Sequence, residues 1–341
     1  MTIAAQSSRT PCLVIAEVGS VHDGSFGNAT KLVDVAAECG ADVVKFQTHI
    51  AAAETLADAP MPQFFQSEPR HAYFQRTAFT LEQWRELSAR CAERTVGFLS
   101  SPFSIEAVEL LERVGVARYK VPSGEVSNLP LLEAIAQTRK PVLLSSGMSS
   151  WAELDEAVET LLHCHGNVTV LQCTSAYPCS YEDVGLNAMR EMGERYRLPV
   201  GLSDHSLTPY ASFAAVALGA SVIEKHLTFS RLMYGSDAAH SVEPREFSDL
   251  VTGIRAIETM LASPVDKTAM AARLEDMKAV FEKSVVSRVD IPAGTPLTAA
   301  MVGVKKPGTG IPARQLREVI GRRVRRDVPR DTLLREDDLL A

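Results

Sequence analysis

Two lysines and two histidines each lie in or at the end of a short apolar run rich in β-branched residues. Lys45 belongs to the run DVVKFQT, and Lys120 belongs to RYKVPSG. His205 ends the run LPVGLSDH, and His226 lies in VIEKHLT. Lysine supplies a point charge for phosphate or carboxylate groups, and neutral imidazole is a common ligand of divalent metals. These residue types predict a site for a small anion beside a metal ion.

Hydroxyl and carboxylate side chains follow the same kind of run. The further polar residues near the run ends are Glu17, Ser101, Ser123, Glu125, Ser145, Ser175, Ser203 and Glu224. Hydroxyls would supply directional hydrogen bonds to an anion that the lysines attract. A ligand with both a phosphate and a carboxylate, such as phosphoenolpyruvate, would use both lysines. The alternative is that Lys45 or Lys120 snorkels, or pairs with a carboxylate inside the fold.

The two histidines are expected to end neighbouring strands, which lie about 5 Å apart. Their imidazoles can then meet on one metal ion, and with water and carboxylates they suit Zn, Mn, Fe or Co. The alternative for each is a hydrogen-bonded histidine of the core. Glu224 alternates with His226 and is expected on the same inward face. Lys225 between them should point outward to a helix layer and be structural.

The apolar runs predict the architecture. They cover residues 12–19, 42–48, 96–102, 118–124, 141–147, 168–174, 198–205 and 222–228, with helix-like stretches between them. Near-continuous apolar runs are typical of parallel strands buried on both faces. Eight βα units in about 250 residues predict a TIM barrel over residues 1–263, with its active site at the C-terminal strand ends. A doubly wound open sheet is the alternative, but no GxGxxG follows the first run. Residues 49–80 are predicted to be an insertion.

The character of the chain changes after Pro264. Residues 264–283 are predicted to be a helical linker, and 284–341 a small domain of short strands. Residues 281–341 carry 12 Lys and Arg against 8 Asp and Glu, whereas the rest is acidic. A weak repeat relates the segments 290–297 and 327–334. A module of this size is near the limit for independent stability, so we expect it to lean on another surface.

Composition excludes several classes of protein. The chain has 341 residues, 35 Lys and Arg, 42 Asp and Glu and a net charge of −7, which is not typical of a nucleic-acid binder. No apolar stretch approaches the roughly 18 residues of a membrane helix. The N-terminal sequence lacks the pattern of a signal peptide, and the six cysteines form no CxxC pair. We therefore expect a cytoplasmic protein with reduced thiols and no membrane partner.

Taken in order, the motifs resemble those of the sialic acid synthases, that is N-acetylneuraminate synthase and its legionaminate, pseudaminate and spore-coat relatives. The matching segments are IAEVGSVHDG, GADVVKFQ, SSPFS, YKVPSGE, LLSSGM, QCTSAYP, GLSDHS, EKH and GSDAAHSVEP. The C-terminal segments KKPGTGI and IPAGTPL resemble the family's antifreeze-like SAF, or β-clip, domain. The resemblance covers nearly the whole chain.

The resemblance implies a condensation of phosphoenolpyruvate with an open-chain N-acyl hexosamine or related sugar, with release of phosphate. The residues that resemble phosphoenolpyruvate contacts are Lys45, Ser101, Lys120, Ser123, Ser145 and Ser175, with Ser203 as a further substrate contact. His205 and His226 resemble ligands of a divalent metal, with Mn first and Mg, Co or Zn as alternatives. The sugar-side or acid–base positions are Glu17, Glu125, Tyr177 and Asp237, and Glu224 is a carboxylate near the metal. The family's dimers place the small domain of one chain over the barrel mouth of the other, so a domain-swapped homodimer is expected.

Three segments depart from the family pattern, and all lie on the sugar side. The family usually has NH where this chain has Val21 and His22. Its KRPG is Lys305-Lys306-Pro307-Gly308 here, and a lysine cannot reproduce the planar fork of arginine. The GPDH of sialate-type members is Gly235-Ser236-Asp237-Ala238 here. We therefore expect Lys306 to lie at the sugar site and to alter which sugar the site accepts.

Two other functions fit the same barrel. A 3-deoxy-ulosonate-phosphate synthase or metal-dependent aldolase would need a second anion site, for which the arginine run 322–326 is the candidate. That run is otherwise a solvated or interface face. A non-catalytic sugar-binding or regulatory protein would be indicated by loss of a lysine or histidine from the strand ends, and none is lost.

Overall fold

The computed structural model describes residues 10–60, 68–164 and 166–340. The chain divides into two compact units, Met1–Ser263 and Pro264–Ala341. The predictions about the N-terminal start and about the middle of the insertion concern residues 1–9 and 61–67, which lie outside the described residues.

The first unit is built around a sheet of eight parallel strands. They are β1 Leu13–Gly19, β2 Val43–Thr48, β3 Gly97–Pro102, β4 Tyr119–Val121, β5 Val142–Ser145, β6 Val168–Cys173, β7 Val200–Asp204 and β8 Val222–His226. Their order is β3-β2-β1-β8-β7-β6-β5-β4, and the two end strands β3 and β4 contact each other. The strands therefore form a nearly closed barrel, which confirms the predicted TIM barrel and not the open sheet.

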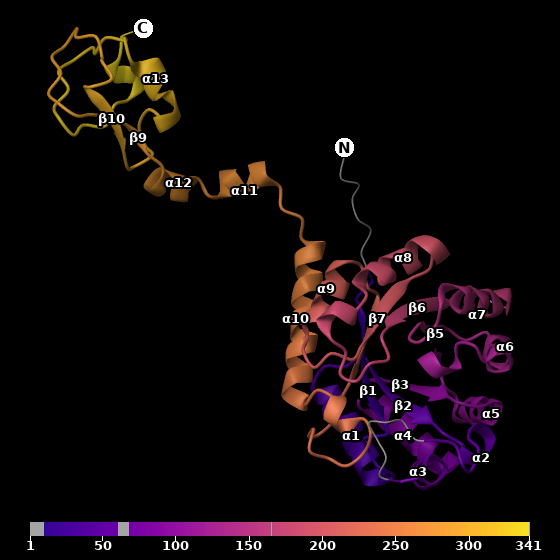
Figure 1. The fold of residues 1–341 in the computed structure, drawn as a ribbon. Coiled ribbons are helices and arrows are strands. Elements are labelled where there is room, and N and C mark those ends of the chain that lie inside the picture. The colour runs from indigo at the N-terminus through magenta and orange to yellow at the C-terminus, as the bar shows by residue number, and fades with distance from the viewer. Residues whose placement is uncertain (1–9, 61–67, 165, 341) are drawn as a thin grey trace. The chain divides into compact units, whose positions relative to one another are not determined.

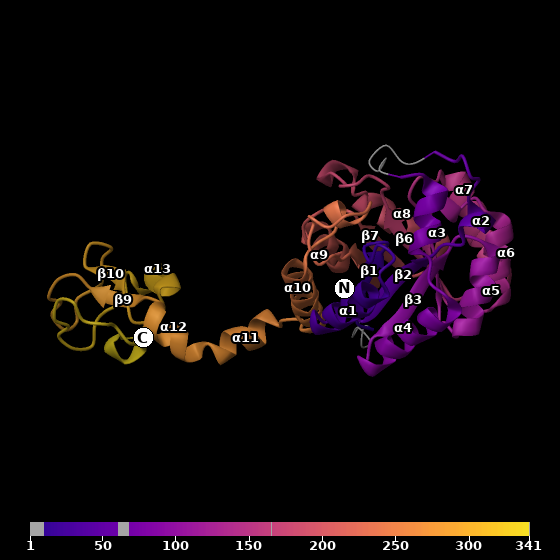
Figure 2. The same cartoon turned by 90° about the horizontal axis from the view of Figure 1, so that it is seen from below.

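Helices surround the strands on the outside (Figures 1 and 2). They are α1 Phe26–Glu38, α2 Ala51–Glu54, α3 Arg70–Thr77, α4 Leu81–Glu93, α5 Ile105–Val114, α6 Leu129–Gln137, α7 Trp151–Cys164, α8 Leu186–Tyr196, α9 Tyr210–Ala217 and α10 Pro244–Ala262. Local signals set several ends. Ser104 caps α5 by accepting from the Ala107 amide at 3.1 Å, and Gly115 ends that helix with φ 85°. Helices α2 and α3 follow β2 in the sequence. The short 3-10 helix η1 Ser123–Glu125 follows β4.

The barrel interior has an apolar level and a polar level. The apolar cluster inside it consists of Ile15, Val43, Leu99, Leu143, Leu171 and Val222. Side chains alternate between the two faces of a strand, so the residue two positions further on each strand also points inward. Those residues are Glu17, Lys45, Ser101, Ser145, Cys173 and Glu224. The pleat of the strands thus places a layer of polar side chains toward the C-terminal ends of the strands, next to the buried apolar layer.

One buried ion pair joins the barrel to its helix layer. Lys225 Nζ lies 2.8 Å from Asp204 Oδ2, and both side chains are almost fully buried. Asp204 also accepts from the Ser212 hydroxyl of α9 at 2.7 Å. Lys225 therefore points outward and is structural, as predicted.

The second unit has its own small core. It contains α11 Lys267–Arg273, α12 Glu275–Phe281, β9 Ser284–Ser287, β10 Val302–Lys305 and α13 Leu316–Val319, with the 3-10 helices η4 Ala313–Gln315 and η5 Glu336–Asp338. Strands β9 and β10 are antiparallel. The arginine run contributes ion pairs within this unit, since Arg322 contacts Glu336 and Arg326 contacts Asp338.

The weak sequence repeat has a structural meaning. Ile291 and Val328 exchange backbone hydrogen bonds of 2.9 Å in both directions. Asp290 Oδ1 accepts from the Arg330 amide at 2.7 Å, and Asp327 Oδ1 accepts from the Ala293 amide at 2.7 Å. The two segments therefore pair with each other and hold each other's turns.

Among the helices of the described residues, none is long and apolar enough to cross a membrane. The six cysteines are free thiols. A cytoplasmic location stays a prediction.

We expect Gly201→Ala to destabilise the barrel, because β7 approaches β8 and β6 too closely there for a side chain. A Cβ on Gly201 would lie 2.7 Å from Leu171 Cδ2 and would also meet the backbone oxygen of Val222. Overpacking of this kind costs about 1–3 kcal/mol of unfolding free energy. Urea denaturation followed by tryptophan fluorescence measures it, because both tryptophans, Trp84 and Trp151, lie in this unit.

The control is Gly27→Ala in α1, where a Cβ meets nothing closer than 4.0 Å. Alanine is favoured over glycine in a helix by up to about 1 kcal/mol, so this variant should be neutral or more stable. Equal stability of the two variants would contradict the close approach.

Candidate functional site

The polar level of the barrel holds a hydrogen-bonded network of two lysines and two carboxylates. Lys45 Nζ lies 3.0 Å from Glu17 Oε1 and 3.6 Å from Glu224 Oε1. Lys120 Nζ lies 3.2 Å from the same Glu224 oxygen. The hydroxyl of Ser203 donates to Glu224 Oε1 at 3.1 Å, and Lys45 donates to the Ser101 hydroxyl at 3.3 Å. Six residues predicted separately from six strands thus meet in one network.

Both lysines therefore pair with a carboxylate inside the fold, as the alternative interpretation of these residues expected. The charges of the four ionised groups cancel, which is what allows them to be buried together. All four are less than a twentieth exposed. The same pairing holds the two ammonium groups at fixed points near the strand ends.

The two lysines differ electrostatically. Burial would lower the pKa of Lys45, but the charges of Glu17 and Glu224 outweigh it, and the pKa is raised. Burial lowers the pKa of Lys120, and Glu224 offsets this only in part while the charge of Lys45 adds to it. Lys120 is therefore the ammonium group that a further anion would stabilise more.

Glu224 is the centre of the network. Burial would raise its pKa, but Lys120, Lys45 and His226 together hold the pKa well below the usual 4.5. The carboxylate is therefore ionised at neutral pH. The buried Ser203 hydroxyl adds a hydrogen bond that favours the same charged form.

Four buried polar atoms at this end of the barrel have no hydrogen-bond partner among the described residues. They are Glu17 Oε2, Glu224 Oε2, Ser145 Oγ and His226 Nδ1. Buried polar atoms in folded proteins are almost always paired, so a group of orphans at one place indicates where a ligand, ion or water binds. All four belong to residues predicted for the site.

A glycine provides a cradle beside the network. A Cβ on Gly147 would lie 2.5 Å from Ser175 Oγ and 2.6 Å from Ser123 Oγ. These two predicted hydroxyls therefore converge over a position that only glycine leaves open. Ser123 also donates to the Cys173 thiol at 3.5 Å, and burial raises the pKa of that thiol. The serines and the glycine backbone offer several donors to one small anion.

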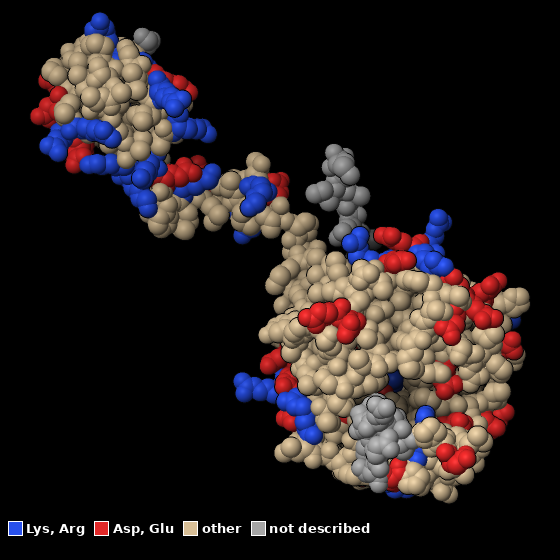
Figure 3. Space-filling model, viewed as in Figure 1, with Lys and Arg blue, Asp and Glu red and all other residues tan. Residues whose placement is uncertain are grey.

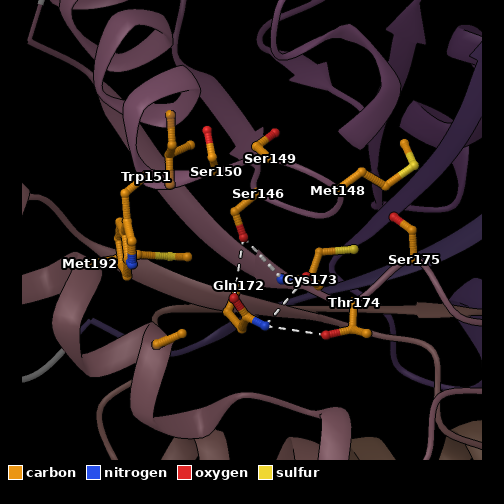
Figure 4. Close-up of a pocket in the computed structure, with 12 residues that line it drawn as sticks. Ser146, Met148, Ser149, Ser150, Trp151, Gln172, Cys173, Thr174, Ser175 and Met192 are labelled. Atoms are coloured by element: carbon orange, nitrogen blue, oxygen red, sulfur yellow. Dashed lines mark hydrogen bonds between the residues drawn. The ribbon is translucent and has the colours of Figure 1, made fainter.

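A pocket of about 330 Å³ adjoins this cradle between the β5–α7 loop and β6 (Figure 4). Its lining includes Ser146 and Met148, which flank Gly147, together with Trp151, Cys173 and Ser175. The Ser146 hydroxyl donates to Gln172 Oε1 at 3.3 Å, which ties the loop to β6. In the space-filling view, Lys or Arg atoms are visible within a hollow in the barrel unit (Figure 3).

The two predicted metal ligands lie side by side at the ends of β7 and β8. The ring centroids of His205 and His226 are 5.5 Å apart, and Tyr177 stacks on His205 at 4.3 Å. His205 Nδ1 donates to the Thr174 carbonyl at 2.9 Å, which leaves the lone pair on Nε2. Burial and then the charge of His226 lower the pKa of His205 to about 3. Its imidazole is therefore neutral, as a metal ligand requires.

Among the described residues, no group of three or more His, Cys, Asp or Glu is arranged to hold a metal ion. The histidine pair can supply two ligands, one with its tautomer fixed and one with an orphaned nitrogen. Water or substrate would have to complete the coordination. The residues present fit a metal ion on those terms.

Two further predicted residues lie at the rim. Asp237 Oδ2 accepts from the Ser20 amide at 2.8 Å, beside the close turn at Gly19. Burial raises the pKa of Tyr177. The Tyr177 ring lies beside both histidines, with its centroid 4.3 Å from that of His205 and 6.2 Å from that of His226.

Glu125 and Lys306 lie outside the lysine–carboxylate network. Glu125 accepts from Asn128 at 2.8 Å, and burial raises the pKa of its carboxyl group. The charged neighbours of Glu125 are Glu54, His49 and Arg70 from the insertion. Lys306 belongs to the second unit, where its ammonium lies 5.0 Å from the centre of the Phe281 ring.

Sequence reasoning missed two histidines. His240 lies 6.1 Å from the Tyr177 ring, and its pKa is lowered by burial and by His226. Its position three residues after Asp237 in GSDAAHS was the available signal. His49 continues the alternation of Lys45 and Gln47 along one strand face, and its ring hydrogen-bonds to Gln47. The period of two was enough to suggest it.

The barrel, the polar layer at its C-terminal end and the small β-rich C-terminal unit together define a TIM-barrel enzyme with an appended SAF domain. The chain belongs to the NeuB family, which it matches over residues 32–266, and it matches the SAF domain over residues 282–340. The two relatives described below are synthases. This chain is an enzyme that forms a carbon–carbon bond.

Three comparisons illustrate the relationship. The chain is 36% identical to the N,N'-diacetyllegionaminic acid synthase of Campylobacter jejuni over 95% of its own length and 99% of that protein. It is 34% identical to human N-acetylneuraminate-9-phosphate synthase, over 96% of its own length and 92% of that protein. The crystal structure of N-acetylneuraminic acid synthetase from Leptospira borgpetersenii, in complex with citrate, aligns with a TM-score of 0.69 at 30% identity, over 79% of this chain and 92% of that one.

We expect Glu224→Gln to lower the unfolding free energy by about 3 kcal/mol at pH 7, because it removes the anion shared by two buried ammonium groups. The folded-state pKa of Glu224 lies below 4.5, so its charge stabilises the fold above that pH, and this stabilisation is lost as the pH falls further. The difference between the two proteins should therefore shrink below pH 4.5. Urea denaturation at several pH values measures it.

Glu93→Gln is the control, since it removes a carboxylate from the exposed Arg90 pair. Surface pairs contribute at most about 1 kcal/mol. A Glu224→Gln effect no larger than this, or one that grows toward acid pH, would contradict the buried network.

Proposed function

We propose that this enzyme condenses phosphoenolpyruvate with an open-chain N-acyl hexosamine-type sugar, giving a nonulosonic acid and inorganic phosphate in a reaction that needs a divalent metal. One observation carries the proposal: among the described residues, four buried polar atoms without a hydrogen-bond partner occur together with two fixed ammonium groups and a pair of histidines at the barrel's C-terminal end. Two relatives are named as synthases of N,N'-diacetyllegionaminic acid and N-acetylneuraminate 9-phosphate, which supports the same product class.

Phosphoenolpyruvate carries a phosphate and a carboxylate, and the site offers two clusters of donors. The hydroxyls of Ser123 and Ser175 over Gly147 would receive one anionic group, with Lys120 as its cation. Lys45 and the Ser101 hydroxyl, 3.3 Å apart, would receive the other. The buried hydroxyl of Ser145, which has no partner, lies on the neighbouring strand to Lys120.

His205 and His226 would hold the metal ion, with Mn first and Mg, Co or Zn as alternatives. When bound, such an ion supplies Lewis-acid polarisation of the sugar aldehyde. The orphaned Nδ1 of His226 and the fixed tautomer of His205 support this assignment. Tyr177, stacked on His205, would keep the imidazole in place.

The reaction forms one carbon–carbon bond and one carbon–oxygen bond, and it breaks the carbon–oxygen bond to phosphate. C3 of phosphoenolpyruvate bonds to the aldehyde carbon of the sugar, whose oxygen takes up a proton and becomes a hydroxyl. A water oxygen bonds to C2, and phosphate leaves with its bridging oxygen. Glu17 or Glu224 would accept the proton of that water through its unpartnered oxygen. Lys45 and Lys120 would stabilise the negative charge of the departing phosphate.

The sugar would extend toward the rim, where Asp237 and Tyr177 lie. Glu125 and, from the second unit, Lys306 are the further candidates for sugar contacts. Lys306 is one of these candidates, Ala238 follows Asp237, and Val21 follows Ser20, whose amide donates to Asp237. We therefore assign these three departures from the usual family pattern to the choice of acceptor sugar.

We also propose that the chain acts as a homodimer in which the SAF unit of one copy covers the barrel mouth of the other. The linker helices support a partner surface. Large apolar side chains on or beside α11 and α12 are about half exposed, namely Leu274, Met277, Val280 and Phe281. Large apolar side chains that gather on the surface of a soluble protein mark a site where another surface binds.

Incubation with phosphoenolpyruvate, Mn²⁺ and a panel of N-acyl hexosamines and diamino-sugars tests the reaction. We expect phosphate release with at least one sugar, and a product mass that matches addition of pyruvate. Absence of phosphoenolpyruvate binding would remove the proposed function and favour an aldolase or a sugar-binding protein. Lys120→Ala and His226→Ala should each abolish release.

Gly147→Ala gives a sharper test of the cradle. The added methyl would displace the hydroxyls of Ser123 and Ser175, so phosphoenolpyruvate turnover should fall at least about tenfold, with little loss of stability. Gly124→Ala is the matched control in the adjacent loop, because a Cβ there meets nothing closer than 4.0 Å. Equal turnover of the two variants would remove the cradle from the site.

Light scattering tests the dimer. We expect twice the mass of the 37.0 kDa chain and loss of activity on dissociation. A fully active monomer would contradict a covering role for the SAF unit.

A further inference from the structure

A chain of hydrogen bonds runs from the insertion into the barrel. Glu54 of α2 lies 2.7 Å from His49 Nδ1, and His49 Nε2 lies 3.2 Å from Gln47 Oε1. The Gln47 amide nitrogen donates to Glu17 Oε1 at 2.8 Å. Glu17 in turn pairs with Lys45. The carboxylate proposed to accept the proton from water is therefore connected, through three side chains, to a helix of the insertion.

The imidazole of His49 is held rigidly. It stacks on Phe74 of α3 with ring centroids 3.8 Å apart, and on Phe103 after β3 at 4.1 Å. Its side chain is 6% exposed, and that of Glu54 is 5% exposed. Glu54 Oε2 also accepts from the Ile50 amide at 3.3 Å, which fixes the carboxylate. His49 can thus change its charge with little change of place.

The hydrogen-bond directions favour one charge state. A carboxylate oxygen and an amide oxygen are both acceptors, so each ring nitrogen of His49 must donate. Only the imidazolium form donates from both nitrogens. With the opposite orientation of Gln47, its oxygen would face the Glu17 carboxylate, and two acceptors would be in contact. The observed arrangement therefore needs a positively charged His49.

The charged groups around His49 are consistent with that form. Glu54 faces His49 from α2, and the carboxyl group of Glu125 in η1 interacts electrostatically with both His49 and Arg70 of α3. His22 lies on the β1 side, where burial lowers its pKa to about 4, so it is neutral. Two carboxylates against one guanidinium leave a net negative surrounding, which favours the imidazolium.

We propose that His49, as an imidazolium held by Glu54, is a positioning residue that orients the Gln47 amide so that the Glu17 carboxylate stays correctly aimed for proton transfer. A primary amide does not pass a proton along, so this chain positions Glu17 and does not feed it protons. Loss of the His49 proton frees the amide to turn and weakens the hold on Glu17. The inference rests on the proposed function, because it gives Glu17 its task.

The kcat of His49 variants tests the role. His49→Gln keeps an uncharged N–H donor toward the Gln47 oxygen, so it should retain most of the wild-type kcat. His49→Phe should lose kcat by about tenfold or more with little change in KM for phosphoenolpyruvate. The exposed His163 supplies the control His163→Gln, which should behave as wild type.

Glu54→Gln gives a second readout. Without the adjacent carboxylate, the imidazolium form of His49 is less favoured, so kcat should fall while KM for phosphoenolpyruvate changes little. Wild-type kcat in Glu54→Gln, or in both His49 variants, would overturn the proposal.

NMR of the imidazole nitrogens separates this inference from the proposed function, because it needs no turnover. In the resting protein at pH 7, the His49 signals should show both nitrogens protonated, as its two acceptor partners require, and Glu54→Gln should reduce that protonated fraction. A neutral His49 at pH 7 would overturn the inference even if phosphate release is found. Failure of phosphate release with a protonated His49 would reject the proposed function and leave the charge state of His49 established. If His49→Phe does not fold, the Glu54→Gln and NMR measurements decide.

Discussion

The burial of two ammonium and two carboxylate groups at one level of the barrel is the constraint on which the rest of the structure depends. Removing any of these ions from water costs several kcal/mol, and only close pairing of opposite charges recovers that cost. Lys45 and Lys120 therefore need Glu17 and Glu224 at about 3 Å, and the strands β1, β2, β4 and β8 must stay in register to supply them. The apolar cluster below, around Ile15 and Leu171, keeps water from entering underneath.

A neutral network of this kind is suited to a site that binds and releases anions. The ammonium groups are held in place before a ligand arrives, so binding costs little reorganisation. Each carboxylate uses one oxygen in the network, and its other oxygen has no hydrogen-bond partner in the part of the chain that the structure describes. These oxygens and the histidine pair lie at the same end of the barrel. The side chains that would bind a substrate are therefore the same ones that pair with each other inside the barrel. Structural and chemical roles share the same side chains at Glu17 and Glu224.

Support for the network comes from elements far away in the sequence. The β5–α7 loop places Gly147 where two serine hydroxyls converge, and Ser146 ties that loop to Gln172 on β6. The insertion reaches Glu17 through His49 and Gln47. The second unit is a separate body with its own core, and its two related segments, 290–297 and 327–334, stabilise each other through reciprocal aspartate caps. Membership of the NeuB family agrees with this division of the chain into a barrel and an SAF domain.

The strands could be located from the sequence, because parallel strands buried on both faces need continuous apolar runs. All eight predicted runs contain a strand, and the shortest, β4, occupies only Tyr119–Val121 of its run. The sequence also determined which residue types reach the C-terminal ends, since the side-chain period of two makes Lys45 and Glu224 point inward. The residues that these side chains contact became known only from the three-dimensional structure. That both lysines pair with carboxylates, that Gly147 leaves room for Ser123 and Ser175, and that His49 holds Gln47 against Glu17 all depend on contacts between strands and loops distant in the chain. Such contacts are set by barrel closure and by loop geometry, which no local pattern of residues encodes.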